Sequence, residues 1–399
     1  MNRQAKPLHA LLLLLLAFLV GSCESLPREL KPRARTRAMW VTRFDYKTRA
    51  DIASIADNCR EAGVTDVVFQ VRGNGTAFYR SSYEPWAEQF EHSDPGFDPL
   101  ATMVEEGHRR GLKVHAWVNV MPAWWGTTPP KDPRQLYNAR PEWMWYDQSG
   151  KRQELCERFY VSLNPALPEV RRYLVDVFRD IVGRYGVDGL HLDYIRMPSE
   201  APATPKGSGS KWLRDARTTA LYEADTGRKA GDDAAYDLWI AEQITNLLRD
   251  IRHMVNTTKR GCELSAATGW DPKHHLANYA QDIDTWMSER LLDAVYPMNY
   301  SEKLEEFGPR CDSWREIANG TPVVMGVMMG AKDVDGQVAR VRRALDVHNG
   351  VSYFAYSKIF DAAGDTLDDQ GKDARFVRER VRKALLPKLD ELSRSGAGG

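Results

Sequence analysis

Asp193 is the residue of this chain best placed for acid–base chemistry. It ends the run GVDGLHLD, in which Leu190 and Leu192 alternate with His191 and Asp193. Such alternation is typical of a buried strand with one aliphatic face and one polar face. Burial or a neighbouring charge can move the pKa of an acid in this position. We therefore expect Asp193 to serve as an acid, a base or an electrostatic stabiliser.

A second carboxylate near Asp193 would complete the usual machinery of glycoside hydrolysis, which uses two acids, or one acid with help from the substrate. Glu302 in NYSEK and Asp271 in TGWDP each follow another apolar run, and Asp45 in TRFDY follows the first such run. Each could instead cap a helix or a turn. The sequence leaves Glu302 and Asp271 as equal candidates for the second catalytic acid, ahead of Asp45.

Alternation also predicts which side chains share the polar face with Asp193. In one run these are His115, Trp117 and Asn119, and in another they are Gln70 and Arg72. Flat aromatic rings can stack on the apolar face of a sugar while polar neighbours bond its hydroxyl groups. The residues expected to bind substrate are Arg72, Trp117, Asn119, His191, Trp270, Asn299 and Tyr300.

These residues must be positioned by a regular scaffold. The chain contains eight short apolar or alternating runs, at 37–43, 66–72, 113–120, 187–195, 262–269, 293–300, 322–329 and 350–357. Amphipathic stretches such as 168–185 separate several of them. Strand–helix alternation predicts a parallel sheet, and eight units favour a closed (β/α)8 TIM barrel, an α/β fold, over an open sheet. We expect extended loops after the second, third and fourth strands, at the end of the barrel where such enzymes keep their chemistry.

The N-terminal residues predict export. Arg3 and Lys6 precede an apolar run, 11–20, which is too short to cross a membrane. Gly21-Ser22-Cys23 follows and resembles a bacterial lipobox, so we expect residues 1–22 to be a signal peptide and Cys23 to carry lipid. Ordinary secretion is the alternative.

The rest of the chain then divides into three parts. Residues 23–36 read as a tether, 37–387 as the barrel domain and 388–399 as a disordered tail. Glu24 after the lipidated Cys23 resembles the pattern for sorting to the outer membrane. We expect the protein to be exported and anchored there, facing the periplasm.

Composition excludes several kinds of partner. The net charge is +0, from 55 basic and 55 acidic residues, so no excess of basic residues favours nucleic-acid binding.

The motifs of cofactor and metal sites are also missing from the sequence. No GxGxxG motif follows the first run, and His115 and His191 lack a third ligand at a known spacing, so we expect neither a cofactor nor a metal. The two histidines read as hydrogen-bonded core residues rather than catalytic groups, although His191 shares the polar face that is expected to meet substrate. Buried free thiols are expected at Cys59, Cys156, Cys262 and Cys311.

Together these segments resemble the glycosyl-hydrolase-like family 10, a group of bacterial (β/α)8 barrels. The resembling segments follow the family order over about residues 37–360, and they are RAMWVTR, VVFQVRGNGTAFYRSSYEPW, GFDPL, RGLKVHAWVN, LNPALPEVRRYL, VDGLHLDYIRMP and YPMNY. The resemblance implies site roles for Asp193, Arg72, Asn119 and Tyr300. One branch of the family is an outer-membrane lipoprotein that cleaves peptidoglycan glycan strands stripped of their stem peptides.

The chain departs from that branch in three places. The branch has two consecutive acids after the fourth strand, and here the second is Tyr194. Where the branch has Asn-Pro-Tyr-Arg and Gln-Ile-Tyr, residues 119–122 read NVMP and residues 298–300 read MNY. Our hypothesis is a lipid-anchored glycoside hydrolase acting on a cell-envelope or extracellular polysaccharide. The alternatives are a sugar-binding lipoprotein that no longer hydrolyses and, more distantly, a metal-dependent polysaccharide deacetylase.

Overall fold

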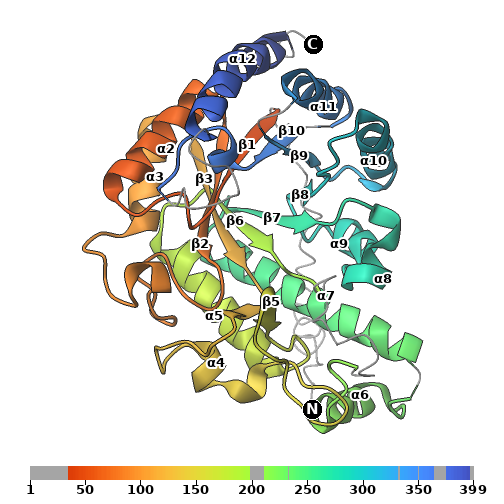
Figure 1. The fold of residues 1–399 in the computed structure, drawn as a ribbon. Helices are drawn as coiled ribbons and strands as arrows, with labels where there is room; N and C mark the ends of the chain where they lie inside the picture. The colour runs from red at the N-terminus through yellow and green to blue at the C-terminus, as the bar shows by residue number, and fades with distance from the viewer. Residues whose placement is uncertain are drawn as a thin grey trace, which may run out of the picture. The chain divides into compact units, whose positions relative to one another are not determined.

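Eight parallel strands form the centre of the structure (Figure 1). This computed structural model describes residues 35–197, 211–231, 233–330, 333–348, 350–363 and 374–395. The strands are β1 (Thr36–Val41), β2 (Asp66–Arg72), β3 (Lys113–Asn119), β6 (Gly189–Asp193), β7 (Glu263–Thr268), β8 (Ala294–Pro297), β9 (Val324–Met328) and β10 (Gly350–Phe354). Their order is β8-β7-β6-β3-β2-β1-β10-β9, and a bridge between Val295 and Val323 brings the two edges together. The sheet is therefore a nearly closed barrel, and the predicted (β/α)8 fold is confirmed.

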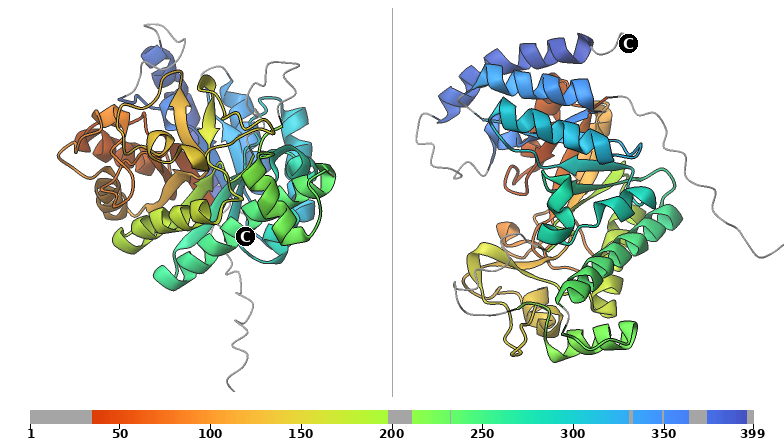
Figure 2. Two further views of the ribbon diagram at one scale, coloured as in Figure 1. Left: turned by 90° about the horizontal axis from the view of Figure 1, so that it is seen from below. Right: turned by 90° about the vertical axis from the view of Figure 1, so that its right-hand side faces the viewer.

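Helices surround this barrel on its outside (Figure 2). Those that pack beside the barrel are α2 (Arg49–Glu61), α3 (Pro99–Arg109), α5 (Pro168–Arg184), α7 (Asp233–Thr258), α8 (His275–Tyr279), α9 (Ile283–Ser288), α10 (Leu304–Ile317), α11 (Val334–Val347) and α12 (Ala374–Ser395), with short 3-10 turns η3 (Pro272–His274) and η4 (Tyr356–Lys358). The first of these helices begins with a reciprocal cap, since Thr48 and Asp51 each accept a hydrogen bond from the other's backbone N–H.

Three long connections follow β2, β3 and β6, as the sequence predicts. The first contains η1 (Glu88–Phe90); the second contains α4 (Leu136–Ala139), η2 (Pro141–Trp143) and the antiparallel pair β4 (Pro122–Gly126) and β5 (Cys156–Ser162); the third contains α6 (Ala216–Thr226). Figure 1 shows α4, β5 and α6 gathered at the lower end of the molecule, opposite α12. These insertions follow the carboxyl ends of β3 and β6, and β5 adds to the wall of the barrel mouth through Tyr160.

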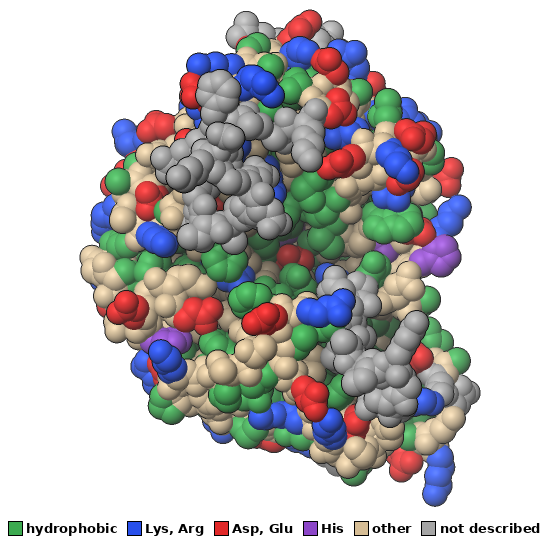
Figure 3. Space-filling view, in the orientation of Figure 1, with side chains coloured by type: hydrophobic (Ala, Val, Ile, Leu, Met, Phe, Trp, Pro, Cys, Tyr) green, Lys and Arg blue, Asp and Glu red, His purple; other side chains and the backbone are tan. Residues whose placement is uncertain are grey.

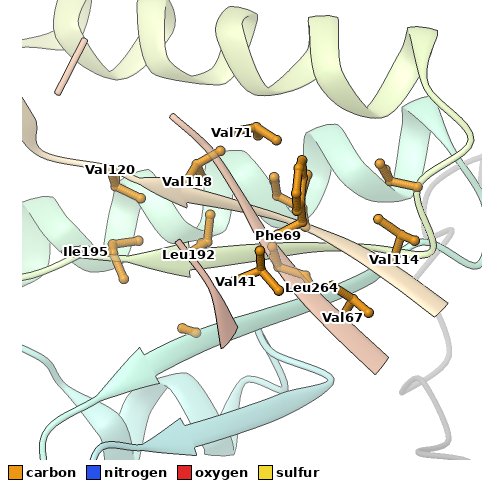
Figure 4. Packing of buried hydrophobic residues seen from close by; sticks show 14 of the residues in the cluster. Val41, Val67, Phe69, Val71, Val114, Val118, Val120, Leu192, Ile195 and Leu264 are labelled. Atoms are coloured by element: carbon orange, nitrogen blue, oxygen red, sulfur yellow. The ribbon is translucent and has the colours of Figure 1, made fainter. Parts of the chain in front are cut away.

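Strand alternation separates two buried layers. Trp40, Val68 and Trp117 belong to a cluster inside the barrel, together with Tyr296. Their strand neighbours, such as Phe69, pack into the larger cluster between strands and helices, which Figure 4 shows from close by. The polar face predicted for β6 is thus the interior of the barrel.

The C-terminal helix corrects one prediction. Residues 388–395 are part of α12, so the expected disordered tail does not begin at 388. Leu385 and Leu389, one turn apart, are both buried, and this packing carries the helix past Pro387.

The N-terminal predictions lie outside the described residues, namely the signal peptide, most of the tether and Cys23. In the described part of the chain, no helix combines the length and apolar character needed to cross a membrane. The four cysteines within it, at 59, 156, 262 and 311, are free thiols, as predicted; three are buried and Cys156 is half-buried.

Candidate active site

A cavity of about 430 Å³ lies at the carboxyl ends of the barrel strands. Figure 3 shows a hollow on this face with hydrophobic side chains along its walls. The side chains and backbone that line the cavity come from seven of the eight barrel strands or the residues just after them, from β5 and from the end of α8: Trp40, Thr42, Arg43, Phe44, Gln70, Trp117, Asn119, Tyr160, Asp193, Tyr194, Arg196, Gly269, Trp270, Tyr279, Met298, Tyr300 and Phe354. Among the described lining residues, Asp193 is the one carboxylate.

Asp193 is the last residue of β6 and is 5% exposed. Its Oδ1 accepts a hydrogen bond from the Tyr194 backbone N–H at 2.7 Å. Burial raises the pKa of Asp193, although the Arg196 charge, the Tyr194 amide and the Trp117 indole oppose this effect. A carboxyl group with a raised pKa holds its proton to higher pH, as a general acid must.

Asn119 links the floor of the cavity to its walls. It lies opposite Asp193 in the register of β3 and β6. Its Oδ1 accepts hydrogen bonds from Trp117 Nε1 at 3.0 Å and Gln70 Nε2 at 3.3 Å, while its Nδ2 donates to the Gly73 carbonyl at 3.0 Å. The amide is therefore fixed in orientation beside the acid, where the sequence predicted a group that binds substrate; that role stays a prediction.

Tyr300 lies on the other side of Asp193. Its ring stacks on Phe354 with centroids 5.0 Å apart. Burial raises the pKa of the Tyr300 phenol, and the neighbouring charge of Asp193 raises it further. The hydroxyl thus stays protonated near the acid and can donate a hydrogen bond to a sugar oxygen.

Two of the predicted aromatic residues have different surroundings. Trp117 packs edge-on against Trp40 at 4.7 Å and belongs to the barrel interior, so it forms part of the cavity floor. Trp270 is 41% exposed, and the Arg310 guanidinium lies 3.9 Å from its ring centroid. An exposed indole at the rim of a cavity is the kind of surface on which a sugar ring stacks.

The structure does not place Arg72 in the cavity. The β2–β3 register shifts between Gln70 and Arg72, so only Gln70 points inward. Arg72 is fully buried on the helix side, where Nε donates to both Glu84 oxygens at 2.9 and 3.0 Å. Tyr173 of α5 donates to the same carboxylate. The expectation that alternation puts Gln70 and Arg72 on one face is wrong because a bulge intervenes.

His191 and Asn299 do not line the cavity either. His191 is buried inside the barrel, where Nδ1 lies 2.9 Å from the Ser265 hydroxyl. Burial lowers its pKa well below the usual value, so it is a neutral core residue. Asn299 points to the helix side, and its Nδ2 donates to the Phe307 carbonyl at 3.1 Å.

None of the three acids expected as partners of Asp193 lines the cavity. Glu302 is exposed, and its carbonyl oxygen accepts a hydrogen bond from Arg340. Asp271 caps η3 by accepting a hydrogen bond from the Lys273 backbone N–H. Burial alone would raise the pKa of Asp271, but the hydrogen bond with His274 lowers it, and the net pKa lies below the usual value. Asp45 is buried and accepts from the Thr42 backbone N–H at 2.7 Å.

Sequence reasoning missed Arg43, Tyr160 and Arg196 as cavity residues. Arg43 lies two residues after the end of β1 and Arg196 three residues after the end of β6, so their positions just past two strand ends could have identified them. Tyr160 comes from β5 and reaches the mouth through tertiary packing, for which the sequence offers no local signal. In the described residues, no three His, Cys, Asp or Glu side chains gather as metal ligands would.

Comparison with known proteins agrees with this architecture. The glycosyl hydrolase-like 10 family model matches residues 35–341. The glycosyl hydrolase DigH of Escherichia coli K12 is 26% identical over 425 residues, covering 88% of this chain and 91% of that protein. The glycosyl hydrolase YngK of Bacillus subtilis is 26% identical over 296 residues, covering 66% of this chain and 54% of that protein.

Solved structures with the same fold include the glycoside hydrolase domain of PgaB (BpsB) from Bordetella bronchiseptica. Its TM-score is 0.60 at 13% identity, covering 88% of this chain and 99% of that one. An α-L-fucosidase from Paenibacillus thiaminolyticus has a TM-score of 0.61 at 12% identity, covering 91% of this chain and 50% of that one. At these identities the likeness concerns the fold, whereas the family match extends over most of the sequence. The chain belongs to the glycosyl hydrolase-like 10 family.

Proposed function

We propose that this protein is a glycoside hydrolase of the cell envelope or extracellular space that uses Asp193 as its general acid. The observation that carries the proposal is the position of Asp193, a buried acid with a raised pKa in a cavity with aromatic walls at the barrel mouth. The family and the barrel neighbours support a carbohydrate as substrate. Glycan strands of peptidoglycan without stem peptides are the preferred candidate, through the resemblance to the branch that cleaves them.

The chemistry follows from the groups on the wall. Protonated Asp193 donates its proton to the glycosidic oxygen as the bond from that oxygen to the anomeric carbon breaks. Water adds its hydroxyl to the anomeric carbon and returns a proton to the Asp193 carboxylate. Asn119 and Tyr300 offer hydrogen bonds to the sugar, and Trp270 offers a stacking surface. Because the described wall holds one acid, the substrate itself would assist the attack, as some glycosidases allow.

The test is incubation of the full chain with stripped peptidoglycan strands and a panel of neutral and acidic polysaccharides. Released reducing ends should appear with the wild type, and Asp193→Asn should lower the rate about 100-fold or more. Asp346→Asn, which changes an exposed acid on α11, is the matched control and should cleave like the wild type. Equal cleavage by Asp193→Asn would remove the acid from the mechanism.

A non-hydrolytic carbohydrate-binding protein is the second candidate. The observation that favours it is the lone carboxylate on the described cavity wall, where Tyr194 follows Asp193. This candidate expects oligosaccharide binding by calorimetry without any cleavage product after long incubation. It also expects Asp193→Asn to bind as tightly as the wild type.

We further propose that lipid on Cys23 anchors the protein to the outer membrane, facing the periplasm. The support is the sequence alone, Gly21-Ser22-Cys23 after an apolar run. Metabolic labelling with a radioactive fatty acid should mark the wild type and leave Cys23→Ser unlabelled. Separation of the two membranes should place the labelled protein in the outer-membrane fraction. Label on Cys23→Ser, or wild type in the soluble fraction, would contradict the anchor.

A further inference from the structure

Two arginine side chains line the cavity beside Asp193. Arg43 follows β1 and is 4% exposed, while Arg196 follows β6 and is 7% exposed. Both residues are therefore largely buried, yet each contributes to the cavity surface. Burying a guanidinium is costly unless a carboxylate or a set of acceptors compensates it.

Within the described part of the chain, neither guanidinium forms an ion pair. Arg43 Nη2 donates to the Tyr160 hydroxyl at 3.4 Å, and its charge lies 4.5 Å from the Phe44 ring centroid. Arg196 Nη1 donates to the Met197 carbonyl at 3.5 Å. The Nε atoms of both arginines are buried without an acceptor.

Other buried arginines in the structure are paired. Arg72 binds Glu84 at 2.8 Å, with both side chains fully buried, and Arg252 binds Asp293 at 3.0 Å. The contrast separates the arginines that hold the fold together from the two in the cavity. The two cavity arginines contact aromatic rings and form long hydrogen bonds, so their N–H groups can still bind an anion.

The two arginines belong to one continuous band of side chains, which we call the arginine band: Arg43, Tyr160, Tyr194 and Arg196. The Tyr160 and Tyr194 rings pack edge-on at 5.3 Å, and the Arg196 guanidinium lies 4.6 Å from the Tyr194 ring centroid. Both positive charges therefore face the same cavity from one connected wall. The only acid on the described wall is Asp193, so two guanidinium groups face one carboxyl group and the cavity carries excess positive charge.

We propose that the arginine band binds a carboxylate on the sugar substrate, which makes the substrate an acidic glycan. The inference rests on the proposed function and adds the charge of its substrate. Guanidinium groups bind carboxylates through two parallel N–H donors, a geometry that a neutral hydroxyl cannot match. The carboxylate could belong to a uronic acid or to a carboxyalkyl ether on an amino sugar. If an attached peptide converts this carboxylate into an amide, the sugar loses its negative charge and should bind the arginine band more weakly.

The experiment compares each acidic glycan with its carboxyl-reduced form, in which every carboxylate has become an alcohol. One arm uses stripped peptidoglycan strands, whose amino sugar carries a carboxyalkyl ether, and the other uses a polyuronate. Wild type should cleave the acidic form of at least one glycan with a kcat/KM roughly 10- to 100-fold above that of the reduced form. The arm that shows the preference identifies the source of the carboxylate.

Variants assign the preference to the band. Arg43→Gln and Arg196→Gln should each lower kcat/KM on the acidic glycan about tenfold more than kcat/KM on the reduced glycan, mainly through KM, so that the preference for the acidic form is lost. Arg43→Lys and Arg196→Lys should recover part of the preference because they keep the charge. The control is Arg214→Gln, since Arg214 stacks on Tyr236 at 3.6 Å and pairs with Asp237 away from the cavity; it should retain the full preference.

The outcomes separate this inference from the proposed function. Equal cleavage of acidic and reduced glycans, or variants that lose activity on both forms alike, would overturn the role of the band while hydrolysis stands. No cleavage of any glycan would overturn the proposed function alone. Calorimetry with the same pairs then decides the inference: tighter binding of the acidic form supports it, and equal or absent binding overturns it.

Discussion

The Arg43 guanidinium occupies the space that a side chain on Gly73 would need. A Cβ atom at position 73 would lie 2.5 Å from Nη1 and 2.6 Å from Cζ of Arg43, far inside van der Waals contact. The Gly73 carbonyl also accepts the hydrogen bond from Asn119 Nδ2. The absence of a side chain after β2 therefore lets an arginine from the end of β1 reach the cavity beside the amide at the end of β3.

The Gly73→Ala substitution tests this relationship. The new methyl group should push the flexible Arg43 side chain away, and kcat/KM on an acidic glycan should fall about tenfold. Since an arginine tip can move at small cost, the melting temperature should change by only a few degrees. Gly231→Ala is the control, because a Cβ there would meet no atom within 4 Å. Adding Gly73→Ala to Arg43→Gln should cause little further loss, and additive losses would show that the glycine acts elsewhere.

The Arg72–Glu84 pair should stabilise the fold without contributing to substrate binding. Both side chains are fully buried, and Arg72 also donates to the carbonyls of Asn119 and Val120. Glu84→Gln leaves a buried guanidinium with no counter-charge, so the free energy of unfolding should fall by about 3 kcal/mol. Urea denaturation measures this change. KM for the folded variant should match the wild type, and a raised KM would return Arg72 to the binding site.

The barrel could be predicted because its signals are local. Each strand is a short apolar run, and alternation along β3 and β6 correctly put Trp117, Asn119 and Asp193 inside. Alternation fails where a bulge inserts one residue, and the sequence DVVFQVR does not reveal that Arg72 has changed face. A one-residue shift moves a side chain to the opposite side of a sheet.

The cavity walls were less predictable than the strands because they depend on contacts between distant segments. Tyr160 of β5 meets Tyr194 after β6 only when the connection after β3 folds back over the mouth. Glu302 and Asp271 do follow strand ends, as the sequence indicated, but local turns direct Asp271 into the cap of η3. The position of a residue along the chain predicts at which end of the barrel it lies, whereas the direction of its side chain depends on the conformation of the loop.

Trp270 should contribute to substrate binding through its exposed ring. Trp270→Ala removes the stacking surface, so KM should rise roughly 2- to 12-fold, equivalent to about 0.5–1.5 kcal/mol. Stability should hardly change because the indole is 41% exposed. Trp125 is also 41% exposed but does not line the cavity, so Trp125→Ala is a matched control with an unaltered KM. An equal rise in KM for both variants would show that the effect does not come from stacking at the cavity.

The buried Asp193 side chain should lower the free energy of unfolding at neutral pH, and Asp193→Asn should raise it. Burial raises the pKa of this acid in the folded protein above the usual aspartate value of about 3.9. At a pH below that usual value, Asp193 is protonated in both states and burial carries no charge penalty. As the pH rises through the raised pKa, the buried group must lose its proton and the folded protein loses stability. Asparagine stays neutral throughout. The free energy of unfolding of Asp193→Asn should therefore exceed that of the wild type at pH 7, and the difference should shrink as the pH falls towards 4. Urea midpoints measured across this range check the prediction, with Asp346→Asn as the exposed control. A variant less stable than the wild type at pH 7 would mean that the fold favours the carboxylate, and Asp193 would then act as a base rather than an acid.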